Sequence, residues 1–420
     1  MKFRVLLGLM AVFCGLQPAF GFEIERRQDQ SPTESSYAAI PYAMNMPGIG
    51  SFYGFAGSIN NIYETEADAY IATMTGDLQG YTGGLFAVPL YFDWLSINYF
   101  TTNFTKASIE SYGRGMDSKK EDMKRVFGDQ IRYGGYALNV KLWEKRLQFY
   151  TTQGKGKSHL TKIYDAEGNL IADISGEAYE MTSSDYGGVL DYTDDRNDPR
   201  RGVRIEQRRA NNPAKTDYDP SYTKIDSTFA FFIPVGKQST WAWNYFASDA
   251  VVSKTGETDR AKIAQRIGVD CSLYPPGTAQ LACQASLNEQ VSQALANNQY
   301  GNATALGGVD FLRAYPQGRF YGAHTRFYGS ELRWNFSDGS EPFDFFLAKG
   351  VRTIMQVAVF HERGTVADRT SDLGKTWKTA TGAGFRLLMS SGFVFRFDVG
   401  TGDEGAASTL FFNYPWALLY

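Results

Sequence analysis

The sequence predicts an all-β protein, a transmembrane antiparallel β-barrel of about 16 strands. The 420 residues include 26 Tyr, 30 Phe and 43 Gly, yet 21% of the chain is charged. Segments of about ten residues alternate apolar and polar side chains between turn-forming Gly, Asp, Asn and Pro, which is typical of membrane strands. A mean hydropathy of -0.33 is too polar for a bundle of membrane helices. A membrane-embedded chain of this composition would therefore have to close its sheet.

Charge and composition exclude other classes. The formal net charge of -3 lacks the basic excess of a nucleic-acid-binding protein. The apolar content is too high for disorder. A soluble sandwich would also alternate, and so would a propeller, but a propeller would repeat at a fixed period and this sequence shows no such repeat.

The N-terminus, residues 1–21, has the pattern of a signal peptide. Lys2 and Arg4 precede the apolar run 5–13, and Ala19-Phe20-Gly21 fits a cleavage site. A short anchor helix is the alternative, although the run is too short to span a bilayer comfortably. Residues 22–47 are polar and irregular, so we expect a short periplasmic leader there and the barrel over 48–420.

Period-2 alternation places the strands in order along the chain. We expect them at 51–63, 67–76, 83–91, 93–100, 105–112, 137–143, 146–150, 186–192, 201–209, 223–235, 239–252, 325–336, 351–364, 376–389, 392–400 and 408–416. An even strand count puts both termini on one side, and the long connections 113–132, 155–182 and 254–322 then all fall on the other side. The first and last strands would meet at a seam, which Pro415 would shorten because proline cannot donate a ladder hydrogen bond.

Several segments resemble the BamA/TamA/FhaC superfamily of bacterial surface antigen barrels. The run Gly308-Val-Asp-Phe-Leu312-Arg313-Ala314-Tyr315 is similar to the arginine motif at the tip of the sixth outer loop in that family, with Ala314 in place of the usual Gly. The segments 329–334 and 360–364 resemble its next two strand motifs and carry Glu331 and Glu362, the latter where the family has Asp. The segments 194–202 and 382–400 resemble a mid-barrel turn and the last strands.

The resemblance implies a sixteen-stranded outer-membrane barrel whose sixth outer loop, within 254–322, folds into the lumen. It implies that Arg313 pairs there with Glu331 and Glu362, which form a lumen lock. Family members that assemble proteins carry periplasmic domains before the barrel, and 22–47 is too short for one, so we expect a barrel-only member. The implied role is protein insertion, translocation or lipid handling, with outer-membrane lipids including lipopolysaccharide, and client proteins, as partners. A passive pore or structural barrel is the alternative, and a barrel lipase a weaker one.

The arginine has a physical rationale of its own. A guanidinium carried into a barrel keeps its charge and needs carboxylates at hand, ideally in bidentate contact. Glu331 and Glu362 lie on neighbouring predicted strands and can share one lumen face if their alternation phases agree. The alternative is a solvated Arg313 and two ordinary lumen carboxylates.

Other residue patterns point to little further chemistry. In an exported protein, Cys271 and Cys283 favour a disulfide over two free thiols, and 278–298 has the composition of a short helix. The three histidines (His159, His324 and His361) are far apart in the sequence. No zinc-ligand spacing or Walker pattern occurs, so we expect no enzyme, metal or cofactor. Asp191, Asp194, Asp195 and Asp198 fit a solvated turn paired with arginines better than a calcium site.

Overall fold

The computed structural model describes residues 35–196, 198–273, 276–337, 342–345, 348–389, 394–412 and 414–416. The expected signal peptide, the first half of the expected leader (22–34) and residues 390–393 lie outside these residues. Among the described residues, no helix is both long and apolar enough to cross a membrane.

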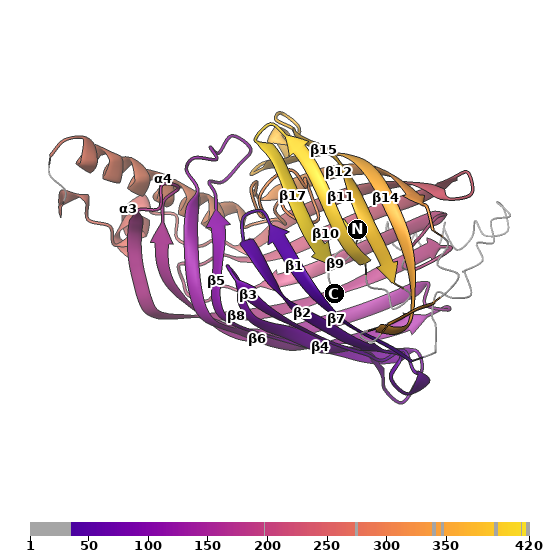
Figure 1. Cartoon of the computed structure of the whole chain (residues 1–420). Coiled ribbons are helices and arrows are strands. Elements are labelled where there is room, and N and C mark those ends of the chain that lie inside the picture. Colours follow the sequence, from indigo (N-terminus) through magenta and orange to yellow (C-terminus); the bar gives the residue numbers. More distant parts are fainter. Residues whose placement is uncertain are drawn as a thin grey trace.

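Sixteen antiparallel strands follow one another around a nearly closed barrel with a seam, which confirms the predicted fold class (Figure 1). They are β1 (Ser36–Met46), β2 (Gly50–Asn60), β3 (Asp68–Gly76), β4 (Gln79–Pro89), β5 (Leu95–Ser111), β6 (Lys124–Leu142), β7 (Leu147–Tyr164), β8 (Leu170–Thr193), β9 (Gly202–Asn212), β10 (Ser221–Val235), β11 (Ser239–Lys254), β12 (His324–Asn335), β14 (Ala348–Ala367), β15 (Lys378–Met389), β16 (Val394–Gly402) and β17 (Gly405–Phe412). Among the described residues, the short strand β13 (Pro342–Phe345) pairs with β14.

Alternation along each strand produces the two faces of the barrel wall. On β11, Ala242 and Phe246 point inward and are fully buried. Trp241, next to Ala242, points outward and is 42% exposed. Because successive side chains of a strand point to opposite faces, this pattern fixes which residues can reach the lumen. The strand residues of the site described below, among them Glu331, Glu362 and Asp398, have the inward phase.

The strand count agrees with the prediction through two offsetting errors. Residues 36–46 form β1, although the sequence suggested an irregular leader over 22–47. Both faces of β1 carry apolar residues, so its alternation is weak. Conversely, the two strands expected at 93–100 and 105–112 are one continuous strand, β5. The seam therefore lies between β1 and β17, not between 51–63 and 408–416, and Pro415 lies beyond the end of β17.

Two of the expected long connections are largely strand. Residues 155–182 belong mostly to the β7–β8 hairpin, and β6 already begins at Lys124 within the expected connection 113–132. The glycines and lysines of these segments suggested loops, but seventeen paired positions of β7 and β8 hold this hairpin together.

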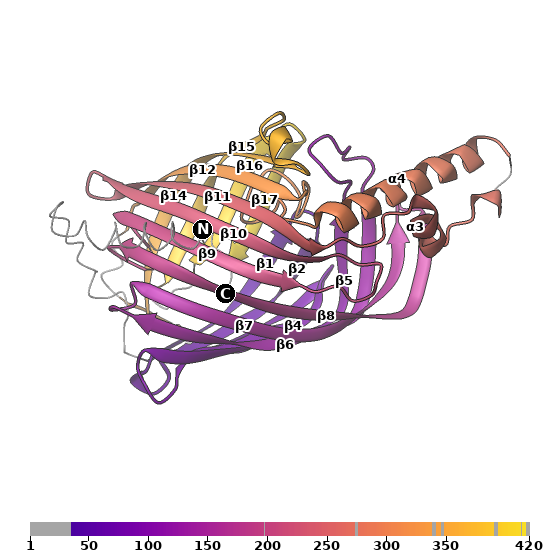
Figure 2. The same cartoon turned by 180° about the vertical axis from the view of Figure 1, so that it is seen from behind.

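One long insertion separates β11 from β12. It contains α3 (Arg260–Ile267), the turn η3 (Cys271–Leu273) and α4 (Thr278–Tyr300). Figures 1 and 2 both show the helices beyond one end of the barrel, beside the extended β5–β8 strands. We call this the loop end, and the opposite end, where β1 begins and β17 ends, the base.

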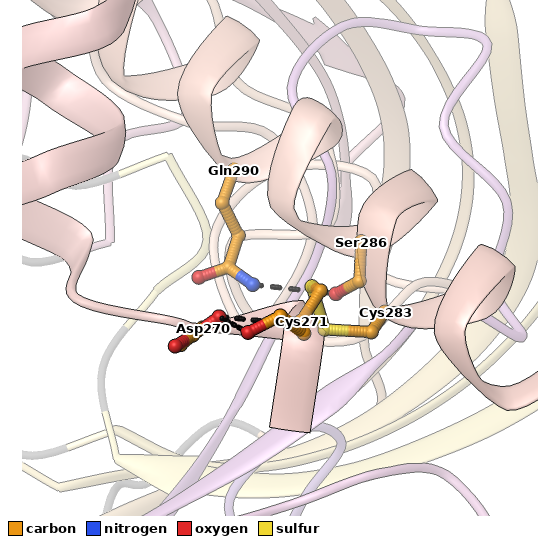
Figure 3. The surroundings of a disulfide bond; sticks show 6 residues. Asp270, Cys271, Cys283, Ser286 and Gln290 are labelled. Atoms are coloured by element: carbon orange, nitrogen blue, oxygen red, sulfur yellow. Dashed lines mark hydrogen bonds between the residues drawn. A yellow bond between two sulfur atoms is a disulfide. The ribbon is translucent and has the colours of Figure 1, made fainter. Parts of the chain in front are cut away.

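A disulfide joins the two parts of this insertion. Cys271 of η3 and Cys283 of α4 are bonded with their Cα atoms 5.6 Å apart, as Figure 3 shows. Asp270 accepts hydrogen bonds from the backbone and hydroxyl of Ser272 beside it. The bond closes the segment between η3 and α4, as expected for an exported protein.

Candidate functional site

After α4 the chain turns into the barrel as a compact loop. Its neck is an isolated bridge in which the backbones of Leu306 and Phe320 exchange hydrogen bonds of 2.8 and 3.0 Å. Gly307 and Gly308 both adopt positive φ, and the Gly308 N–H donates to the carbonyl of Tyr315. These conformations favour glycine because it has no Cβ. The loop therefore presents its tip to the lumen as a defined structure.

Arg313, at the tip of this loop, is 1% exposed and meets three carboxylates. Its Nε donates to Oε1 of Glu362 at 2.8 Å, and its backbone N–H donates to Oε2 of the same carboxylate at 2.9 Å. Its Nη1 donates to Oδ2 of Asp398 at 2.8 Å, and Nη2 donates to Oε2 of Glu331 at 3.1 Å. Three strands, β12, β14 and β16, thus hold one guanidinium.

Three further arginines complete this buried group of charges, which we call the lumen cluster. Nε of Arg333 donates to Oε1 of Glu331 at 2.7 Å, and Nη1 of Arg386 donates to the same oxygen at 2.7 Å. Nη1 of Arg396 lies 3.2 Å from Oδ2 of Asp398. The lumen cluster consists of Arg313, Glu331, Arg333, Glu362, Arg386, Arg396 and Asp398.

Asp310 on the same loop brings the local charges closer to balance. The lumen cluster alone contains four arginines and three carboxylates. Burial raises the pKa of Asp310 to about 6, although Arg396 and Arg313 oppose that shift. At neutral pH its carboxylate therefore offsets the remaining positive charge. Such compensation is required because an unpaired buried charge is strongly unfavourable.

Aromatic rings enclose the tip arginine. The ring centroid of Phe360 lies 3.6 Å from the guanidinium carbon of Arg313. Beyond the end of β17, the indole Nε1 of Trp416 donates to Oε1 of Glu362 at 3.0 Å. Gly329 makes room for this indole, since a Cβ there would lie 2.5 Å from the ring. The segment after the last strand is therefore part of the site.

The other predicted loop residues pack around the arginine. Leu312 and Tyr315 are fully buried, and Ala314 is nearly so. The hydroxyl of Tyr315 donates to the carbonyl of Thr379 at 3.1 Å and accepts from the backbone N–H of Asp403. Residue 314 lies against Gly400 on β16, whose missing side chain allows the close approach. These contacts fix the backbone on both sides of Arg313.

A second buried arginine anchors the inward loop at a point closer to the loop end of the barrel. Arg319 is 1% exposed and donates from Nε and Nη2 to the two carboxylate oxygens of Glu404 at 2.9 and 2.7 Å. It also donates to the hydroxyl and carbonyl of Ser118. This bidentate pair was not predicted, because nothing in the sequence places the β16–β17 turn beside the loop.

We predicted a solvated acidic turn after β8, but two of its aspartates are buried. Asp195 and Asp198 are 8% and 7% exposed. Oδ1 of Asp198 accepts from the hydroxyl of Tyr414 at 2.7 Å, and Oδ2 accepts from the amide of Asn335 at 3.1 Å. The turn thus anchors the chain that follows β17. No group of three or more potential metal ligands occurs among the described residues.

The seam between β1 and β17 is held differently from the other strand junctions. Across the described residues, no ladder pairs these two strands, whereas even the short β3–β4 junction has seven residue pairs. The amide Nδ2 of Asn45 donates to the carbonyl and the hydroxyl of Ser408 at 3.1 and 3.3 Å. The first residues of β1 pair instead with β14, at Tyr37 and Ala38. One junction of the barrel is therefore weak.

The structure brings Arg313, Glu331 and Glu362 together and adds Asp398 and Arg386, which sequence reasoning did not select. A signal for these two existed. In the segment 395–399, Phe397 and Val399 alternate with the charged Arg396 and Asp398. This alternation places Arg396 and Asp398 in the lumen. It does not show which residues of other strands they contact there.

No family model and no curated protein matches this sequence. Among solved structures, CdiB from Escherichia coli is 12% identical, with a TM-score of 0.50, and the alignment covers 90% of this chain and 61% of that one. BamA from Haemophilus ducreyi, lacking POTRA domains 1–3, is 10% identical with a TM-score of 0.47, covering 91% and 70%. CdiB from Acinetobacter baumannii is 9% identical with a TM-score of 0.47, covering 90% and 59%.

The similarity to the Escherichia coli CdiB barrel confirms the predicted resemblance at the level of the fold. The aligned part covers 90% of this chain. It spans 61% of the length of the Escherichia coli CdiB chain. At these identities the likeness concerns the architecture and not the activity.

Proposed function

We propose that this protein is an outer-membrane barrel of the BamA-like superfamily that inserts or translocates proteins through its β1–β17 seam. The observation that carries the proposal is the contrast between the weak seam and the strongly held lumen loop. The barrel can then open sideways while its interior stays blocked. Outer-membrane lipids, including lipopolysaccharide, and client proteins are the proposed partners.

The seam is the junction that opens at least cost. Separating a strand ladder breaks many backbone hydrogen bonds, each contributing about 0.5–1.5 kcal/mol net. At the seam, Asn45 and Ser408 supply two side-chain hydrogen bonds. Pro41 within β1 also lacks a backbone N–H, which suits an edge strand. An opened β1 edge would offer backbone groups for an incoming strand.

The inward loop, in contrast to the seam, resists displacement from the lumen. Removing one partner of a buried ion pair costs about 3–5 kcal/mol, and Arg313 has three carboxylate partners. Withdrawing the tip would strand these charges in the lumen. We therefore expect the loop to stay seated while β1 and β17 separate.

The outer wall supports a membrane location. Aromatic side chains project outward and are strongly exposed on several strands, among them Tyr53, Phe55, Tyr99 and Tyr136. An apolar, aromatic outer face is the pattern expected of a barrel that contacts lipid.

A reversible crosslink across the seam tests the proposal. The double variant Asn45→Cys/Ser408→Cys would tie β1 to β17 under oxidising conditions. In proteoliposomes, we expect the oxidised form to lose the ability to insert an added unfolded outer-membrane protein, measured by protease protection, and reduction to restore it. The matched control is Asn45→Cys/Ser51→Cys, because these residues are already partners in the β1–β2 ladder. Equal activity in the oxidised seam variant and the oxidised control would contradict the proposal.

A passive pore is the competing function, and conductance separates the two. With the loop seated in the lumen, we expect planar bilayers containing the protein to show little steady current. A large, stable current that persists in Arg313→Ala would support the passive pore.

A further inference from the structure

The inner face of the first three strands is apolar, whereas the lumen cluster on β12–β16 is charged. Tyr42 and Met44 of β1, Phe52 of β2, and Ala72 and Met74 of β3 are buried and pack together as one cluster, which we call the inner wall. The outward residues of the same strands are also apolar and exposed, as Phe55 and Ile71 show. Because barrel interiors in membranes are usually polar, a wall that is apolar on both faces needs an explanation.

The inner wall faces an internal cavity of about 730 Å³. This volume lies within the range of about 300–1,000 Å³ that is common for small-molecule sites. Strands β9, β10 and β11 contribute the polar groups Arg204, Glu206, Thr228 and Asn244 to the cavity lining, together with the apolar Ala230 and Phe232. The cavity therefore has an apolar wall on β1–β3 and a more polar lining on β9–β11.

Two of these polar groups lack a partner within the described structure. Asn244 is 1% exposed and Thr228 is 8% exposed, and neither Oδ1 of Asn244 nor Oγ1 of Thr228 has a hydrogen-bond partner among the described residues. Leaving a buried polar atom without a hydrogen-bond partner is unfavourable. Both atoms are covered by neighbouring side chains of the barrel wall, so they mark the polar side of the cavity and do not themselves contact a ligand.

The cavity also borders the weak junction of the barrel. Phe411 of β17 lines it from one side of the seam, and Ile40, Tyr42 and Met44 of β1 line it from the other. An apolar molecule in the bilayer can therefore reach the cavity by the same sideways opening. The charged segment 22–34, with Glu23, Glu25, Arg26, Arg27 and Asp29, is a poor match for an apolar wall.

We propose that this cavity binds the acyl chain of a membrane lipid that enters through the seam. The chain lies against the inner wall, and the hydroxyl, ester or amide groups of the lipid lie toward the side lined by Arg204 and Glu206. The hydrocarbon of the bound chain would cover the apolar side chains of the inner wall and keep them away from lumen water, which favours binding. This site goes beyond protein insertion, since a bound chain would cover the inner wall while the seam is closed.

Site-specific photocrosslinking tests the proposal in vesicles of phosphatidylethanolamine, phosphatidylglycerol and lipopolysaccharide. A benzophenone amino acid replaces Met44, whose side chain points to the cavity. The outward neighbour Ala43 is the positive control, and Thr152, a buried inward residue of β7 away from the cavity, is the negative control. We expect mass spectrometry to find lipid adducts at positions 44 and 43 and none at 152.

A cavity-filling variant provides the second arm. Ala72→Trp should lower the lipid adduct at position 44 to the level of the Thr152 control, whereas the outward Thr73→Trp should leave it unchanged. A difference in gel migration between unheated and heated samples checks that both variants fold. The proposal is overturned if position 44 gives no lipid adduct, or only adducts to residues 417–420 or to an added client protein. Because no client is needed, the result is independent of the insertion assay.

Discussion

Glu331 is the most heavily used side chain of the lumen cluster. Its two oxygens accept from Arg313, Arg333 and Arg386, and it is fully buried. Hydrogen bonds between ionised partners are about twice as strong as neutral ones. Removing the charge of residue 331 would leave three guanidinium groups without their shared partner.

We therefore expect Glu331→Gln to destabilise the barrel by about 3–5 kcal/mol. The substitution keeps the size of the side chain, so the loss reports the charge. Asp398→Asn should cost less, because Glu331 and Glu362 would still hold Arg313. Denaturant unfolding in detergent micelles measures both variants, and equal midpoints would contradict the expected order.

A matched pair at position 313 separates charge from geometry. Arg313→Lys retains the charge but cannot reach three carboxylates with a planar fork, whereas Arg313→Ala removes both. We expect both to lower the unfolding midpoint, with alanine the more severe. Arg132→Ala, at an exposed position on β6, should leave the midpoint unchanged. If lysine matched the wild type, the fork geometry would be irrelevant.

At the scale of single elements, alternation found the strands whose two faces differ and failed where they do not. It located β10, β11 and β12 closely, since polar and apolar residues alternate there throughout. It missed β1, which is apolar on both faces and contains Pro41. It divided β5 where Asn103 and Thr105 interrupt the outer face. Partners across the lumen, such as Asp398 and Trp416, were beyond any local pattern.

The disulfide of the insertion acts locally. A crosslink that closes a separation of 12 residues restricts the unfolded segment and contributes about 3 kcal/mol by the chain-entropy estimate. We expect Cys271→Ser/Cys283→Ser to speed proteolysis within the insertion while the denaturant midpoint of the barrel stays unchanged. A lowered barrel midpoint would show that the helices brace the strands.

At the scale of the whole molecule, we expect the inward loop to determine whether the barrel conducts. Its neck residues Leu306 and Phe320 are hydrogen-bonded neighbours, so a short linker can replace the tip without moving the strands. We expect deletion of 307–319 to produce a large, steady current in planar bilayers. The Cys271→Ser/Cys283→Ser variant should remain as quiet as the wild type. A silent deletion variant would mean that other residues close the lumen.

The anchoring of Tyr414 and Trp416 beside Asp198 and Glu362 has a consequence for biogenesis. These aromatic residues are translated after every strand, yet they complete polar contacts made by the turn after β8 and by β14. A nascent barrel that has not received them holds Asp198 and Glu362 with fewer donors. We therefore expect copies that terminate before Tyr414 to stay loosely assembled and open to degradation.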